Sequence, residues 1–187
     1  MNLIHKLYTK YMTTQLLFDL ESTGLLRRGS TIHCIVMRDM NDVDAPLVFD
    51  YKPERAVIQG VKQLENADAL IGHNIINYDI PLIKEQHEDF DPQGEIYDTL
   101  VMARLYYPNI IERDYEIRPA GMPQRLYGRH SLEAWGYRLK CFKGDFGKSD
   151  SNDWSTYTPE MLDYCIQDTL VTARLFQLLQ RRMNDYA

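Results

Sequence analysis

The sequence has few cysteines and no long apolar run, and it shows no signal for export. Its three cysteines (Cys34, Cys141 and Cys165) are too few and too scattered for a disulfide framework or a zinc site, and they suit a reducing, cytoplasmic compartment. No apolar stretch approaches the roughly 20 residues that span a bilayer, so no membrane partner is expected. The N-terminus also lacks the apolar core and the small-residue cleavage site of a signal peptide.

The composition is that of a soluble globular domain. The chain has 187 residues, of which 44% are hydrophobic and 26% are charged. This length is enough to bury a sizeable core in one domain. The net charge of −6 gives no general attraction to phosphate, although residues 104–143 hold eight Lys or Arg against four Asp or Glu. Charge therefore neither favours nor excludes a nucleic-acid partner.

The apolar pattern predicts an N-terminal extension followed by one domain. Residues 1–14 have the spacing of a short amphipathic helix, which either packs on the domain or docks a partner. The domain then occupies residues 15–187. Apolar runs predict strands at residues 15–20, 31–38, 47–51, 69–72 and 95–97. Periodicity and capping residues predict helices at residues 53–66, 78–87, 98–106, 131–139 and 158–183.

Two segments show no clear periodicity, residues 107–129 and 144–157, and both are expected to be irregular. Three strands in a meander, followed by alternating helices and strands, predict an α/β fold. We expect a mixed sheet flanked by helices in a single domain.

Two acids stand at the end of the first predicted strand. Asp19 and Glu21 are two residues apart, so their side chains point to the same face. Like charges so close repel each other, and a bound divalent cation would resolve the conflict. A solvated strand end leading into a turn is the alternative.

A third acid follows the fourth predicted strand. Asp79 lies in the first turn of a predicted helix, after the connection that contains His73 and Asn74. Acids at this position are common partners of the helix dipole. His73 and Asn74 are candidates for substrate binding, although such residues more often make structural hydrogen bonds.

The last predicted helix carries a tyrosine and an acid on one face. Tyr164 and Asp168 are four residues apart, and both are costly to bury unless something binds them. Each of these signals is weak alone, but together they are much more specific.

The three motifs together resemble a known family. Asp-x-Glu, an Asp preceded by Asn-x-x-x-Tyr, and Tyr-x-x-x-Asp are the exonuclease motifs of the DEDD superfamily, in its tyrosine-containing subgroup. Residues 97–105 and the stretch Ser-Leu-Glu-Ala-Trp-Gly-Tyr-Arg-Leu at residues 131–139 are similar to the proofreading domain of short-tailed-phage family A DNA polymerases. The resemblance covers about residues 16–179 and places the enzyme in the host cytoplasm.

The resemblance implies a ribonuclease-H-like fold with two divalent cations, Mg²⁺ or Mn²⁺, roughly 4 Å apart. By similarity, Asp19 bridges both cations, and Glu21 and Asp168 complete the site that activates water. Asp79 holds the second cation, and Tyr164 orients the attacking water.

The implied substrate is the single-stranded 3′ end of DNA, from which nucleoside monophosphates are released. Leu25, in the loop after the first motif, is a candidate wedge against the terminal base; ordinary packing is the alternative. A DNA polymerase is a possible partner in trans. Two further readings stay open: a 3′–5′ exonuclease of RNA, and a non-catalytic subunit that holds a polymerase or a DNA end.

Overall fold

A five-stranded mixed sheet organises the computed structural model, which describes residues 13–24, 29–141 and 154–185. The strands are β1 (Gln15–Ser22), β2 (Ile32–Asp39), β3 (Asp42–Phe49), β4 (Ala69–Gly72) and β5 (Glu95–Asp98). Their order is β3-β2-β1-β4-β5. The strands β1, β2 and β3 pair antiparallel, whereas β4 pairs parallel to both β1 and β5. The predicted mixed sheet is confirmed.

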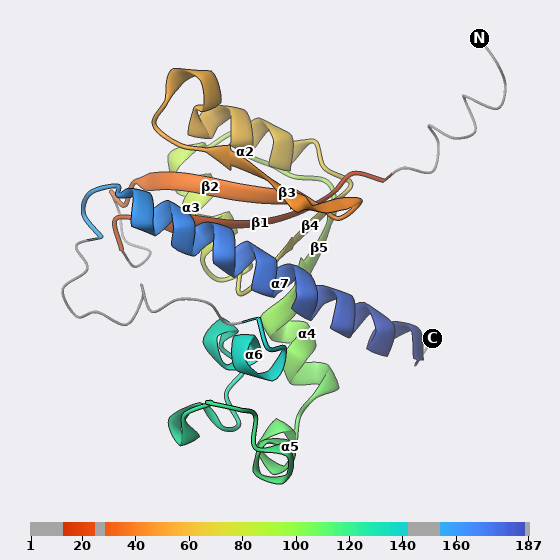
Figure 1. Ribbon diagram of the computed structural model, residues 1–187. Coiled ribbons are helices and arrows are strands. Elements are labelled where there is room, and N and C mark those ends of the chain that lie inside the picture. Colours follow the sequence, from red (N-terminus) through yellow and green to blue (C-terminus); the bar gives the residue numbers. More distant parts are fainter. Residues whose placement is uncertain (1–12, 25–28, 142–153, 186–187) are drawn as a thin grey trace, which may run out of the picture.

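Helices cover both faces of the sheet (Figure 1). On one face lie α2 (Val57–Glu65) and α3 (Asp79–Gln86), and on the other lies the long α7 (Pro159–Asp185). The alternation of β1 explains both contacts, because Phe18 joins the core under α2 and α3 whereas Leu17 packs against Ala173 and Phe176 of α7. Side chains at odd positions of β1 therefore face α7.

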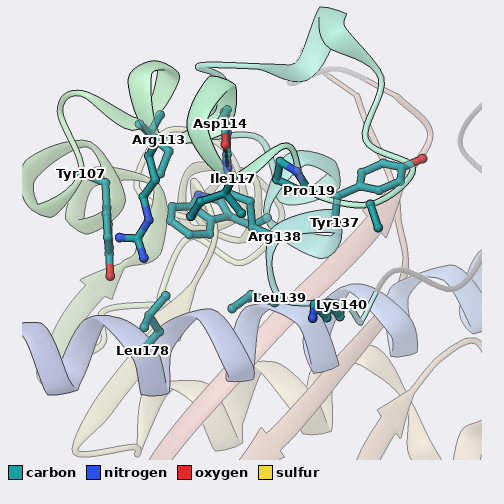
Figure 2. Close-up of a pocket in the computed structure, with 13 residues that line it drawn as sticks. Tyr107, Arg113, Asp114, Ile117, Pro119, Tyr137, Arg138, Leu139, Lys140 and Leu178 are labelled. Carbon is teal, nitrogen blue, oxygen red and sulfur yellow. Dashed lines mark hydrogen bonds and ion pairs between the residues drawn. The ribbon is translucent and has the colours of Figure 1, made fainter.

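Three further helices, α4 (Thr99–Tyr106), α5 (Ile110–Ile117) and α6 (Leu132–Arg138), extend from the sheet on the side where β5 ends (Figure 1). An ion pair ties α5 to α6, because the Arg138 guanidinium donates to both carboxylate oxygens of Asp114, at 2.9 and 2.6 Å. Both side chains line the pocket between α5, α6 and α7 that Figure 2 shows. Arg138 also lies 4.9 Å from the centre of the Trp135 ring.

Several predicted boundaries were wrong. Residues 107–129, expected to be irregular, contain α5 and the 3-10 helix η2 (Gln124–Leu126). The buried face of α5 combines apolar Ile110 with charged Asp114. The predicted helix at 53–66 is divided into η1 (Pro53–Arg55) and α2 by the extended Ala56. Strand β3 begins at Asp42, five residues before the predicted start.

Most of the predicted N-terminal helix lies outside the described residues, and Thr13 and Thr14 lead directly into β1 without helical structure. None of the helices that the structure describes, including the 27 residues of α7, combines the length and the apolar composition that crossing a membrane requires.

Candidate active site

Strand β1 presents two carboxylates beneath α7. Asp19 and Glu21 continue the face on which Leu17 packs against α7, as the period of two requires. In the sheet they stand opposite Val36 and Cys34 of β2, respectively. Both side chains are half-buried, so neither is a simple solvated strand end.

Helix α7 brings the third motif to the same place. Cys165 packs against Cys34 and Val36 on this face of the sheet, so one turn of α7 lies directly over the end of β1. On that turn, the Tyr164 hydroxyl is hydrogen-bonded to the Asp168 side chain. The two side chains, four residues apart, therefore share one face of α7 as predicted and contact each other directly.

The connection from β4 to α3 delivers the fourth carboxylate. A side chain at Gly72 would collide with Ile75 and with the backbone oxygen of Phe18, at 2.2 and 2.9 Å from its Cβ, so the connection needs glycine to fold back onto β1. Asn74 follows in the left-handed conformation, with φ of 69°. Asp79 then begins α3 and is 3% exposed.

Asp98, at the end of β5, fixes this connection. Its carboxylate accepts hydrogen bonds from the backbone N–H groups of Asn74 and Ile76, at 3.0 and 3.2 Å. It also caps α4 by accepting from the N–H of Leu100 at 2.9 Å. One buried acid thereby links the loop before Asp79 to the start of α4.

Burial raises the pKa values of all four carboxylates, and repulsion within the cluster adds to the shifts at Asp19, Glu21 and Asp168. Burial is the largest cause at all four, and it raises the pKa of Asp19, Glu21 and Asp168 well above the usual range and that of Asp79 to about 7. Repulsion from Asp79 adds to the shift at Asp19, and repulsion from Asp19 adds to the shifts at Glu21 and Asp168. Asp79 is buried and the other three carboxylates are half-buried, and so much negative charge shielded from water is costly without cations.

Cys165 is a neighbour that the sequence reasoning missed. Its Sγ lies 3.7 Å from Asp19 Oδ2, and possible ligand atoms of Asp19, Glu21 and Cys165 all lie within 4.8 Å of one another. Burial raises the pKa of the Cys165 thiol, which therefore keeps its proton and donates to Asp19. The ionised donors are then all oxygens, which suit Mg²⁺ or Mn²⁺ better than zinc.

His73 and Asn74 lie beside the carboxylate cluster rather than in it. The Nδ1 atom of His73 is 2.9 Å from Thr99 Oγ1, and burial lowers the pKa of His73 to about 4. Asn74 accepts a hydrogen bond from Asn77 at 3.2 Å. Both residues make structural contacts, and both also line a hollow of about 530 Å³ together with Arg104 and other residues. Leu25, the candidate wedge, lies outside the described residues.

Comparison with known proteins identifies relatives by sequence and by fold. The DNA-directed DNA polymerase of Enterobacteria phage T3 is 29% identical to this chain over an alignment 187 residues long. The alignment covers 88% of this chain and 26% of the polymerase. The chain thus spans about a quarter of the length of this curated relative. The resemblance to phage DNA polymerases that the motifs predicted is confirmed.

Solved structures with the same fold include NrnC and an exoribonuclease. NrnC of Brucella melitensis, in a structure with bound Mg²⁺, superimposes with a TM-score of 0.62 at 17% identity, covering 94% of this chain and 76% of NrnC. Escherichia coli RNase D, an exoribonuclease, gives a TM-score of 0.60 at 13% identity, covering 92% of this chain and 40% of RNase D. The profile of the RNase H superfamily matches residues 16–180, and the chain therefore belongs to the RNase H superfamily.

Proposed function

We propose that this protein is a metal-dependent 3′–5′ exonuclease that releases nucleoside monophosphates from the single-stranded 3′ end of DNA. The observation that carries the proposal is the convergence of four carboxylates (Asp19, Glu21, Asp79 and Asp168) from three separate elements. A cluster so costly to bury is typical of a site that binds cations. We assign the activity to a domain of residues 15–187.

The residues present fit two divalent cations. When bound, such cations stabilise charge on the leaving oxygen and lower the pKa of the attacking water. Asp19 would contribute to holding both cations, because its carboxylate interacts with Asp79 and with Asp168. Glu21 and Asp168 repel each other and would share one position, with Asp79 at the second.

Tyr164 is proposed to orient the attacking water. Its hydroxyl is hydrogen-bonded to Asp168, and burial raises the pKa of Tyr164 above its ordinary value, so the phenol keeps its proton. A neutral phenol can donate one hydrogen bond and accept another. This combination suits the positioning of a water molecule better than the removal of its proton.

The substrate strand is proposed to enter over the hollow next to His73 and Asn74. Strands β1 and β4 are parallel neighbours, so the hollow at the carboxyl end of β4 adjoins the carboxylates at the end of β1. Arg104 and Arg129 line the hollow, and none of the Asp and Glu residues that the structure describes does. Contacts from arginine to backbone phosphates are independent of sequence, as removal of any terminal base requires.

The test is digestion of a 5′-labelled single-stranded DNA in the presence of Mg²⁺. We expect a ladder that shortens from the 3′ end, and no ladder with EDTA or with the Asp19→Ala/Glu21→Ala protein. Persistence of the ladder in the double variant would show a contaminating nuclease or a different site. An intact strand with both Mg²⁺ and Mn²⁺, on DNA and on RNA, would instead favour the non-catalytic subunit.

RNA is the second candidate substrate, and the similarity in fold to an exoribonuclease is the observation that favours it. Matched 5′-labelled DNA and RNA strands of one sequence decide between them. We expect a higher kcat/KM for DNA because the relative found by sequence is a DNA polymerase. A higher kcat/KM for RNA would show that RNA is the preferred substrate.

A polymerase partner in trans is proposed on the sequence similarity to a DNA polymerase. Its test is whether a mismatched 3′ end is removed faster when the polymerase is added.

A further inference from the structure

Strand β2 carries a buried arginine on the face that α7 covers. Cys34 and Val36 pack against Cys165 of α7, and Arg38, two residues further along β2, faces the same helix. The residue is only 3% exposed. A strand position of this kind is usually apolar, because burying a charge is costly unless the charge is well bonded.

The guanidinium of Arg38 joins α7 to the β2–β3 hairpin. Its Nε donates to Thr169 Oγ1 at 2.9 Å, and its Nη2 donates to the carbonyl oxygen of Ile166 at 3.0 Å. Its Nη1 donates to the carbonyl oxygen of Val43, in β3, at 2.6 Å. Thr169 completes the arrangement by donating from Oγ1 to the Ile166 carbonyl at 2.8 Å. The planar guanidinium therefore fixes the position of one turn of α7 along the helix axis, and its rotation about that axis, relative to β2.

That turn carries the third motif. Ile166 lies midway between Tyr164 and Asp168, and Thr169 directly follows Asp168. Along the chain, the two residues that bond to Arg38 (Ile166 and Thr169) therefore alternate with the two residues of the motif (Tyr164 and Asp168). A shift of the turn would move the Tyr164 hydroxyl and the Asp168 carboxylate together.

Stability alone does not explain a charged residue here. Arg38 forms no ion pair with a carboxylate among the residues that the structure describes. Its three bonds go to neutral oxygens, and the attraction from the Asp44 carboxylate is smaller than the effect of burial, which lowers the pKa of Arg38. An apolar side chain of similar size at a buried position is often as stabilising as a buried charge, or more so. What the apolar side chain lacks is the fixed geometry of the fork.

We propose that Arg38 is a positioning residue for the active site, which sets the α7 turn so that Tyr164 and Asp168 meet the carboxylates of β1 in the productive arrangement. The inference rests on the function proposed above. Because Arg38 is buried, it acts through its bonds to the backbone of Ile166 and the hydroxyl of Thr169.

The test compares three variants. Arg38→Met removes the fork and keeps most of the volume. Thr169→Val removes the two hydrogen bonds of the Thr169 hydroxyl, to Arg38 and to the Ile166 carbonyl, with almost no change of shape. Leu179→Ala is the matched control, because Leu179 is fully buried in the same helix but packs with Trp135 and Leu175, ten residues beyond Thr169. The measurements are kcat, KM for a single-stranded DNA, the Mn²⁺ concentration for half-maximal activity, and backbone hydrogen exchange over residues 164–169 in EDTA.

For Arg38→Met we expect kcat per folded molecule to fall by roughly 10- to 100-fold, with a similar rise in the half-saturating Mn²⁺ concentration. KM for the strand should stay unchanged, and exchange over residues 164–169 should become faster. Thr169→Val should change the same quantities in the same direction, by less. Leu179→Ala should lower the melting temperature and leave kcat and the Mn²⁺ requirement at their wild-type values.

The proposal is overturned if Arg38→Met and Thr169→Val lose activity only in proportion to their unfolded fraction, with unchanged Mn²⁺ requirement and hydrogen exchange. It is also overturned if Leu179→Ala changes the Mn²⁺ requirement as much as Arg38→Met does. Should the wild-type protein cleave no strand at all, the proposed function fails, and hydrogen exchange over residues 164–169 alone then decides whether Arg38 fixes the turn.

Discussion

Replacing Asp79 with asparagine should stabilise the metal-free protein at alkaline pH, although it removes one of the four carboxylates of the proposed metal site. Asp79 is 3% exposed, and its pKa is raised from 3.8 to about 7, chiefly by burial. Asparagine has the same shape and can still accept the hydrogen bonds from the backbone N–H groups of Leu20 and residue 79. What it lacks is the charge.

The sign and size of the effect follow from the two pKa values. The folded state binds the Asp79 proton more tightly than the unfolded chain does, so the stabilisation is complete below about pH 4 and is lost as the pH rises through about 7. Between about pH 5.5 and pH 8 the wild-type protein should therefore lose roughly 2 kcal/mol that Asp79→Asn keeps. For a domain of this size that is a difference of about 4–8 °C in melting temperature.

The assay is thermal unfolding, followed by circular dichroism, at the two pH values in EDTA and in Mg²⁺. Asp79→Asn should melt above the wild-type protein at the higher pH in EDTA and close to it at the lower pH. Mg²⁺ should stabilise the wild-type protein and have much less effect on the variant. If the two proteins show equal pH dependence of the melting temperature, or equal stabilisation by Mg²⁺, then the Asp79 charge does not destabilise the metal-free protein and cations do not offset it.

Other substitutions test single contacts. Asp19→Ala should abolish measurable cleavage in a gel assay while the protein stays folded, and wild-type activity would remove Asp19 from the site. Tyr164→Phe should retain a remnant, with kcat lower by roughly 10²–10⁴-fold, and an undiminished kcat would exclude water positioning by the phenol. Asp114→Ala leaves Arg138 buried without its partner, so chemical denaturation should show a loss of about 3–5 kcal/mol. Arg125→Ala breaks the more exposed pair with Glu133 and should cost less than about 1 kcal/mol; similar losses in both variants would contradict the burial argument.

The elements that carry the motifs could be predicted closely from the sequence. Strand β4 has the predicted bounds, because Gly72 and the polar connection mark its end. The helix predicted to begin at residue 131 is α6, and the Ser131 hydroxyl caps it by accepting from the N–H of Ala134. These signals are local: a glycine, a cap or an apolar run determines the structure of its own neighbourhood.

The contacts that hold the site together could not be predicted in this way. Arg38 stands at the end of a strand whose pattern is otherwise apolar, and nothing nearby in the sequence shows that its partner is Thr169. Asp98 was placed at the start of a helix, but its bonds to the loop at Asn74 cross from one strand end to another. Cys165 was set aside because three scattered cysteines form no zinc pattern, and only the packing of α7 on β1 brings it to Asp19. Contacts between residues far apart in the chain leave no local periodicity.

The most direct test of the proposed metal site is anomalous diffraction from crystals of the wild-type protein soaked in Mn²⁺. We predict two peaks roughly 4 Å apart, both next to Asp19, one close to Glu21 and Asp168 and the other near Asp79. Crystals of Asp19→Ala should lose both peaks. No peak among the four carboxylates of the wild-type protein, or peaks that persist at full strength in Asp19→Ala, would contradict the claim that this cluster is the catalytic metal site.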